Sequence, residues 1–270
     1  MNISFFARPA SWDDIRHRLN CGVSVIRGKQ IAKYLGAKLN PKSGYDNDIC
    51  IYVKPGINTQ FAKHSYIDVM DVDKETVMEF NKLDIPMILS SLFAYEIFSK
   101  AYRNSRFIFI PQHHCNYGRI KRNRKKITTV GILGYHASFQ YPIEDVRKRL
   151  KKIGMELLFE NKILDRLDAV NFYKKIDIQI VWIRHAWMTK NAMKLYNAAS
   201  FGIPTIGYRR SEYKEFEGYY IPVETIEELI EEVKKLKDSN QYYAQYADKI
   251  VNKAEDYHIS KIAELYKRLE

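Results

Sequence analysis

The chain has 270 residues, of which 46% are hydrophobic and 28% are charged, as in ordinary folded globular proteins. Lys and Arg outnumber Asp and Glu by 44 to 32, and the net charge of +12 favours anionic partners: nucleotide phosphates, nucleic acid or an acidic membrane surface. The three cysteines are odd in number and far apart, which excludes a disulfide framework and predicts a reducing, cytoplasmic location. No apolar run is long enough for a transmembrane segment, and the opening run is too short for a signal peptide.

The first part of the chain alternates short apolar runs with stretches of helical spacing. The runs expected to form strands are residues 3–6, 48–53, 66–72, 85–89 and 106–110. The stretches expected to form helices are residues 25–35, a stretch from about residue 74, and residues 93–102. This alternation predicts a parallel sheet covered by helices on both faces.

A polar and basic segment, residues 111–126, interrupts the alternation and is expected to link two domains, residues 1–112 and 113–270. Strands are then expected at residues 127–133, 155–159, 176–183 and 204–207. Helices are expected at residues 143–153, 167–173, 191–201, 225–236, 242–254 and 258–269. The sequence therefore predicts an α/β protein of two Rossmann-like domains.

The most specific pattern is the stretch 190–207, which reads KNAMKLYNAASFGIPTIG. A helix with Lys194 near its start ends at Gly202, a typical helix stop, and Pro204 precedes the next strand. The helix begins beyond the carboxyl end of a predicted strand, where ligands bind in open α/β sheets, and its first N–H groups favour a phosphate. Asn197 lies three residues after Lys194, on the same helical face.

This stretch resembles the donor-binding signature of GT-B glycosyltransferases, especially the large retaining family of group 1, or family 4-like, sugar transferases. The matching residues are Lys194, Ala198, Ala199, Gly202 and Pro204. The resemblance spans about residues 127–236 and implies two Rossmann-like domains with parallel sheets facing a cleft, the first for the acceptor and the second for a nucleotide-sugar donor. It also implies that Lys194 contacts the donor diphosphate. The sequence departs from the family at Asn197, where a carboxylate that binds the ribose usually stands.

Two loops of the second domain supply further candidate donor-binding residues. They are Gly134, Tyr135 and His136 in the first loop, and Arg184, His185 and Lys190 in the second. A glycine after the first strand of the domain lets a phosphate or sugar approach the backbone. Basic side chains in the second loop would neutralise a diphosphate leaving group in place of a metal ion. Ordinary surface turns explain both loops equally well.

Asp13 and His17 are the candidate catalytic residues, because they lie in the loop of the first domain that a GT-B acceptor would meet. An inverting enzyme needs one base to take the acceptor proton, whereas a retaining enzyme of this fold does not. A solvated loop in which Asp13 caps a helix is the simpler explanation of either residue alone.

Two patterns suggest a metal site but have better explanations. Asp71 and Asp73 form the D-x-D triplet typical of metal-dependent GT-A enzymes, yet Asp73 stands where a helix N-cap is expected. The adjacent His113, His114 and Cys115 lack the spacing of a tetrahedral site. Neither a metal nor any other cofactor is therefore expected.

The sequence favours a metal-independent, hexosyltransferase-like enzyme that moves a sugar from a nucleoside-diphosphate sugar to an acceptor. An anionic acceptor, either nucleic acid or a membrane-surface lipid, fits the net charge. One alternative is a nucleotide-sugar epimerase of the same fold. The other is a nucleic-acid-binding or DNA-modifying protein, which would use the six basic residues among residues 119–126 and bind in a salt-dependent way.

Overall fold

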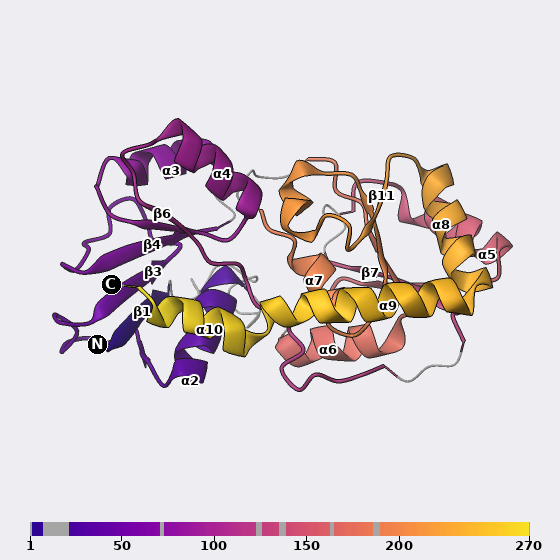
Figure 1. The fold of residues 1–270 in the computed structure, drawn as a ribbon, viewed down its shortest axis with the longest axis horizontal. Coiled ribbons are helices and arrows are strands. Elements are labelled where there is room, and N and C mark those ends of the chain that lie inside the picture. Colours follow the sequence, from indigo (N-terminus) through magenta and orange to yellow (C-terminus); the bar gives the residue numbers. More distant parts are fainter. Residues whose placement is uncertain are drawn as a thin grey trace. The chain divides into compact units, whose positions relative to one another are not determined.

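The computed structural model describes residues 2–7, 22–70, 73–122, 126–134, 139–162, 165–185 and 190–269. The chain forms two compact units (Figure 1). Unit 1 comprises Met1–His113, Trp187–Asn191 and Ile259–Glu270, and unit 2 comprises His114–Ala186 and Ala192–His258. The chain therefore passes between the units four times, after residues 113, 186, 191 and 258. The C-terminal segment, Ile259–Glu270, belongs to unit 1.

The sheet of unit 1 has six parallel strands in the order β2-β1-β3-β4-β5-β6. They are β1 (Ile3–Ala7), β2 (Lys38–Leu39), β3 (Ile49–Val53), β4 (Ser65–Val69), β5 (Met87–Leu89) and β6 (Phe107–Phe109). Every residue of β3 and β4 is buried. This is the pattern of central strands in a parallel sheet that is covered on both faces, as the apolar runs predict.

The helices of unit 1 are η1 (Ser24–Gln30, a π-helix), α2 (Ile31–Leu35), α3 (Lys74–Asn81), α4 (Leu92–Ala101) and α10 (Ile259–Lys267). Asp73 and Ser91 cap α3 and α4, because their side chains accept hydrogen bonds from the N–H groups of Thr76 (2.7 Å) and Ala94 (3.3 Å). The N-cap role predicted for Asp73 is thus confirmed. Figure 1 shows α10 beside α2, and the two helices are in contact.

The sheet of unit 2 has five parallel strands in the order β11-β10-β9-β7-β8. They are β7 (Thr129–Leu133), β8 (Glu156–Glu160), β9 (Ile178–Val181), β10 (Thr205–Tyr208) and β11 (Ile221–Val223). The helices are α5 (Ile143–Lys152), α6 (Arg166–Lys175), α7 (Met193–Ala199), α8 (Ile226–Asp238) and α9 (Asn240–Ala254), with 3-10 turns η3 (Ser211–Phe216) and η4 (Glu255–Tyr257). The main core lies between the sheet and the helices α5 and α8.

The segment expected to link the two domains, residues 111–126, makes specific contacts at several of its described residues. Residues 111–116 are all buried. The Asn116 side chain donates to the carbonyl of Ser200 at 2.8 Å, and Arg119 pairs with Glu255. Arg122, with only 9% of its side chain exposed, forms an ion pair with Asp177. The first half of the segment is thus buried, whereas Arg119, Lys121 and Lys126 remain exposed.

Within the described residues, no helix has the length and apolar character needed to cross a membrane.

Candidate functional site

The carboxyl ends of the central strands of unit 2 gather several of the predicted donor-binding residues at one edge of the sheet. Gly134 directly follows β7, has φ 122°, and donates its N–H to the carbonyl of Glu160 at the end of β8 (2.9 Å). Other residues rarely adopt this conformation, so a glycine fits the position. Arg184 and His185 follow β9 and are exposed. This is the edge at which open α/β sheets bind ligands.

Gln140, which the sequence analysis did not single out, joins the two loops at this edge. Its Oε1 accepts hydrogen bonds from the backbone N–H groups of Arg184 (2.6 Å) and His185 (2.9 Å). Its Nε2 donates to the carbonyl of His185 at 3.0 Å, and its own N–H donates to the carbonyl of Trp182 at 2.8 Å. No local sequence signal marks such a residue, because its partners lie more than 40 positions away.

The guanidinium group of Arg184 rests on aromatic rings. Its Cζ lies 5.8 Å from the ring centroid of Trp182 and 5.6 Å from that of Tyr208, and the two rings pack edge to face. The cations at the end of β10 differ, since Arg209 and Arg210 form ion pairs with Glu224 and Glu212. Arg184 has no carboxylate partner among the residues that the structure describes.

Lys194 is the second residue of α7 and is half-buried. The buried Gln179 of β9 donates its Nε2 to the carbonyl of Lys194 at 3.0 Å and to Oγ1 of Thr205 at 3.2 Å. These bonds fix the start of α7 over strands β9 and β10. Contact between Lys194 and a donor diphosphate stays a prediction.

Asn197 has a structural partner. Its side chain is buried, and its Oδ1 accepts a 2.7 Å hydrogen bond from the backbone N–H of Cys115. A buried N–H group needs an acceptor, so the amide fastens the chain at Cys115 to α7. The ribose contact that the family resemblance implies for Asn197 would compete with this internal bond, and it stays a prediction.

The remaining predicted residues belong to unit 1 or lie outside the described residues. Lys190 is half-buried and belongs to unit 1, whereas Arg184, His185 and Lys194 belong to unit 2. The other four are Asp13, His17, Tyr135 and His136, which lie outside the described residues.

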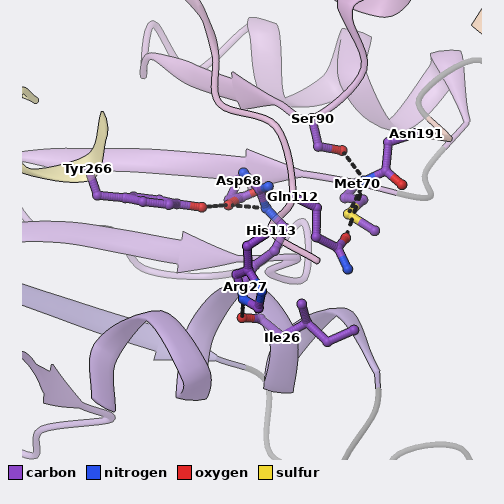
Figure 2. Close-up of polar contacts among 9 residues, drawn as sticks. All are labelled: Ile26, Arg27, Asp68, Met70, Ser90, Gln112, His113, Asn191 and Tyr266. Carbon is purple, nitrogen blue, oxygen red and sulfur yellow. Dashed lines mark hydrogen bonds and ion pairs between the residues drawn. The ribbon is translucent and has the colours of Figure 1, made fainter. Parts of the chain in front are cut away.

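Unit 1 contains a second polar cluster, beyond the carboxyl ends of β4 and β5 (Figure 2). There Nδ2 of Asn191 lies 3.3 Å from Oγ of Ser90, 3.2 Å from Oε1 of Gln112 and 3.5 Å from Sδ of Met70. All four residues are buried. The cluster therefore fastens the segment that ends at Asn191 to the sheet of unit 1, a tertiary role that the sequence pattern did not indicate.

Figure 2 also shows a buried ion pair of unit 1. Nε of Arg27, in η1, donates to both carboxylate oxygens of Asp68 in β4, at 2.9 and 2.7 Å, and Tyr266 of α10 donates its hydroxyl to Asp68 at 2.9 Å. Burial raises the pKa of Asp68, and the charge of Arg27 opposes that effect. Because these side chains are almost fully buried, we assign them to the core of unit 1 rather than to a ligand site.

No protein-family model matches the sequence, and no curated protein matches it. The fold, in contrast, matches solved structures. A glycosyltransferase from Rickettsia africae aligns with a TM-score of 0.63 and 10% identity over 99% of this chain and 98% of that chain. The β-glucosyltransferase of T4 phage aligns with a TM-score of 0.57 and 11% identity over 100% of this chain and 99% of that chain.

TarM of S. aureus aligns with a TM-score of 0.60 and 13% identity over 83% of this chain. The chain spans only 55% of the length of TarM and 60% of the chain matched in the GtfA/B complex. These neighbours are glycosyltransferases of the GT-B class, built like this chain from two parallel α/β sheets. The fold predicted from the donor-helix pattern is therefore confirmed: the chain has the GT-B fold of glycosyltransferases.

Proposed function

We propose that the chain is a glycosyltransferase that moves a sugar from a nucleoside-diphosphate sugar to an acceptor, without a metal ion or other cofactor. The observation that carries the proposal is the placement of Arg184. Its guanidinium group is held over two aromatic rings, lacks a described carboxylate partner and stands at the ligand-binding edge of a sheet whose fold is shared with glycosyltransferases.

The chemistry of transfer explains why a cation is needed there. The bond between the anomeric carbon and the diphosphate oxygen breaks, and the electron pair leaves with the nucleoside diphosphate. The acceptor oxygen bonds to the anomeric carbon and gives up its proton to a general base or to the departing diphosphate oxygen. Cations fixed near the leaving oxygen stabilise the charge that develops on it. Arg suits this task because its planar guanidinium binds phosphate through two parallel hydrogen bonds. Lys194, at the start of α7, would supply a second positive charge.

Metal independence follows from the same assignment. Asp73, the one described residue of the D-x-D triplet, uses its carboxylate to cap α3. In the proposal, Arg184 and Lys194 supply the positive charge that a metal ion supplies in GT-A enzymes.

The acceptor is proposed by class. A net charge of +12 favours an anionic acceptor, such as a nucleic acid or a lipid headgroup at a membrane surface. The rival function of a nucleic-acid-binding protein that uses residues 119–126 loses part of its support, since Arg119 and Arg122 are engaged by Glu255 and Asp177.

The test compares nucleotide binding by two arginine variants. Arg184→Ala should weaken the binding of the preferred nucleoside diphosphate about 10- to 100-fold in calorimetry, after a screen of UDP, GDP, ADP and CMP by thermal stabilisation. Arg209→Ala is the matched control. This exposed arginine directly follows β10 and is already paired with Glu224, so the variant should bind the nucleotide normally.

Product analysis then identifies the reaction. A sugar joined to an acceptor, with turnover that survives chelation of divalent ions, would support the proposal. An isomerised nucleotide sugar formed without any acceptor would replace it with the epimerase. Steeply salt-dependent nucleic-acid binding with no nucleotide binding would reject both enzymes.

A further inference from the structure

We infer that Gln140 is a positioning residue for the donor diphosphate: it fixes the backbone of the loop after β9 so that Arg184 is presented to the phosphates in one orientation. This inference rests on the proposed function, because Arg184 is the residue through which Gln140 would act. Gln140 lies outside the stretch 190–207 that resembles the donor-binding signature.

Gln140 forms hydrogen bonds with several backbone groups of the loop after β9. Strand β9 pairs with β10 as far as Val181, and the chain then leaves the sheet. Beyond that point Gln140 binds the carbonyl of Trp182, the N–H of Arg184, and both the N–H and the carbonyl of His185. A single residue therefore replaces the lost strand partner for four backbone groups.

The chemistry of the side chain fits this task closely. Its side-chain oxygen accepts hydrogen bonds from two N–H groups, and its side-chain nitrogen donates one to a carbonyl. The hydrogen-bond partners therefore fix the orientation of the amide group. A carboxylate would supply the acceptor without the donor, and an aliphatic chain would supply neither.

Groups other than Gln140 hold the side chain of Arg184 and the start of the loop. The rings of Trp182 and Tyr208 hold the guanidinium of Arg184 from one side, and Arg210 donates to the carbonyl of Ile183 at 3.2 Å. None of these contacts involves Gln140. Loss of Gln140 should thus loosen the exposed loop while the core of unit 2 stays folded.

An ordered loop matters for binding because a loop that samples many conformations must lose that freedom when the ligand binds. With Gln140 in place, Arg184 is already held when the diphosphate arrives. Without it, the same cation is present but must be ordered during binding, so affinity falls although no ligand contact has been removed.

The test is a double-mutant cycle on nucleoside-diphosphate affinity. Gln140→Ala should weaken binding roughly 3- to 30-fold in the native background and in Lys194→Ala, but should have little further effect in Arg184→Ala. Gln140→Asn, which keeps the amide but is one methylene shorter, should behave like Gln140→Ala. Gln241→Ala, at an exposed glutamine of α9, is the matched control and should leave affinity unchanged.

A second measurement follows the loop without a ligand. Hydrogen exchange at the amides of Arg184 and His185 should speed up in both Gln140 variants, while exchange in strands β7 and β9 should stay slow.

The possible results distinguish a failure of the positioning role of Gln140 from a failure of the proposed donor site. If Gln140→Ala weakens binding equally with and without Arg184, or leaves affinity and exchange unchanged, Gln140 has no positioning role and the proposed function still stands. If no nucleotide binds, or if Arg184→Ala and Lys194→Ala both bind normally, the donor site itself is wrong and the inference is overturned with it.

Discussion

The hydroxyl of Tyr266 in the last helix donates a 2.9 Å hydrogen bond to Oδ2 of Asp68, a residue of central strand β4 that lies 198 positions earlier. Both side chains are buried, and the same carboxylate pairs with Arg27. The C-terminal helix is thus joined to the polar centre of unit 1 rather than resting on its surface.

Tyr266→Phe should destabilise unit 1 by about 1–3 kcal/mol, because the buried Asp68 loses one of its donors while the aromatic ring is kept. The measurement is the free energy of unfolding in urea. Tyr34→Phe, at a tyrosine with 48% exposure, provides the control and should change stability little. Equal stabilities of the two variants would contradict the role given to Tyr266.

Lys194→Ala should weaken nucleoside-diphosphate binding about 10- to 100-fold, because a charge-assisted bond to phosphate is lost while the hydrogen bonds around α7 use the backbone of this residue. Lys194→Arg should recover part of the affinity. Calorimetry would decide the question, with Lys234→Ala at an exposed position of α8 as the control. Unchanged affinity in Lys194→Ala would remove this residue from the donor site.

Asn197→Ala should lower the free energy of unfolding by about 1–3 kcal/mol, since the buried N–H of Cys115 loses its acceptor. Asn252→Ala, on the exposed side of α9, should have almost no effect. If stability is preserved and only nucleotide affinity falls, Asn197 serves the ribose contact that the family resemblance implies rather than the internal bond.

The helix N-cap formed by Asp73 should make the stability of the fold depend on pH. The hydrogen bond from Thr76 holds the pKa of Asp73 below its usual value of 3.8. The cap therefore stabilises the fold fully above pH 3.8, and this contribution is lost as the pH falls through the lower pKa of the folded state. The stability difference between the native chain and Asp73→Ala should shrink in that acidic range. Asp73→Asn, which caps without titrating, should show no such change relative to Asp73→Ala.

Two thiols should resist alkylation in the folded protein. Burial raises the pKa of Cys115 to about 12 and that of Cys50 to about 11. Because the thiolate is the reactive form, iodoacetamide at about pH 8 should modify neither of them in the native state and both in urea. Peptide mass spectrometry can follow each thiol separately, and rapid labelling of either in the folded chain would show that its environment is open.

The order of strands and helices could be predicted from the sequence because it depends on local patterns. Apolar runs marked both sheets, and Asp73 was recognised as a cap from its position alone. The two-residue strand β2 is too short to carry an alternating pattern. The π-helical turns of η1 were not predicted either, because helical spacing does not distinguish them from an α-helix.

The candidate site was harder to predict, because its key relationships connect distant positions. Gly134, Arg184 and His185 were found from their places after strands, which is a topological argument. Gln140 lies in no motif, and its partners are 42 to 45 positions away, counted from Trp182 and from His185. The partner of Asn197 is 82 positions away. A local pattern carries no information about such contacts.

The bond between Tyr266 and Asp68 also means that unit 1 can complete its core only late in synthesis. Unit 1 is encoded mainly at the start of the chain, yet its core lacks α10 until residues 259–267 have left the ribosome. Unit 2 has all of its residues once residue 258 has emerged. The later-encoded unit can therefore complete its core first, and Asp68 and Arg27 lack their last partner until α10 has been made. This order is the opposite of the usual N-terminal-first folding of domains during translation.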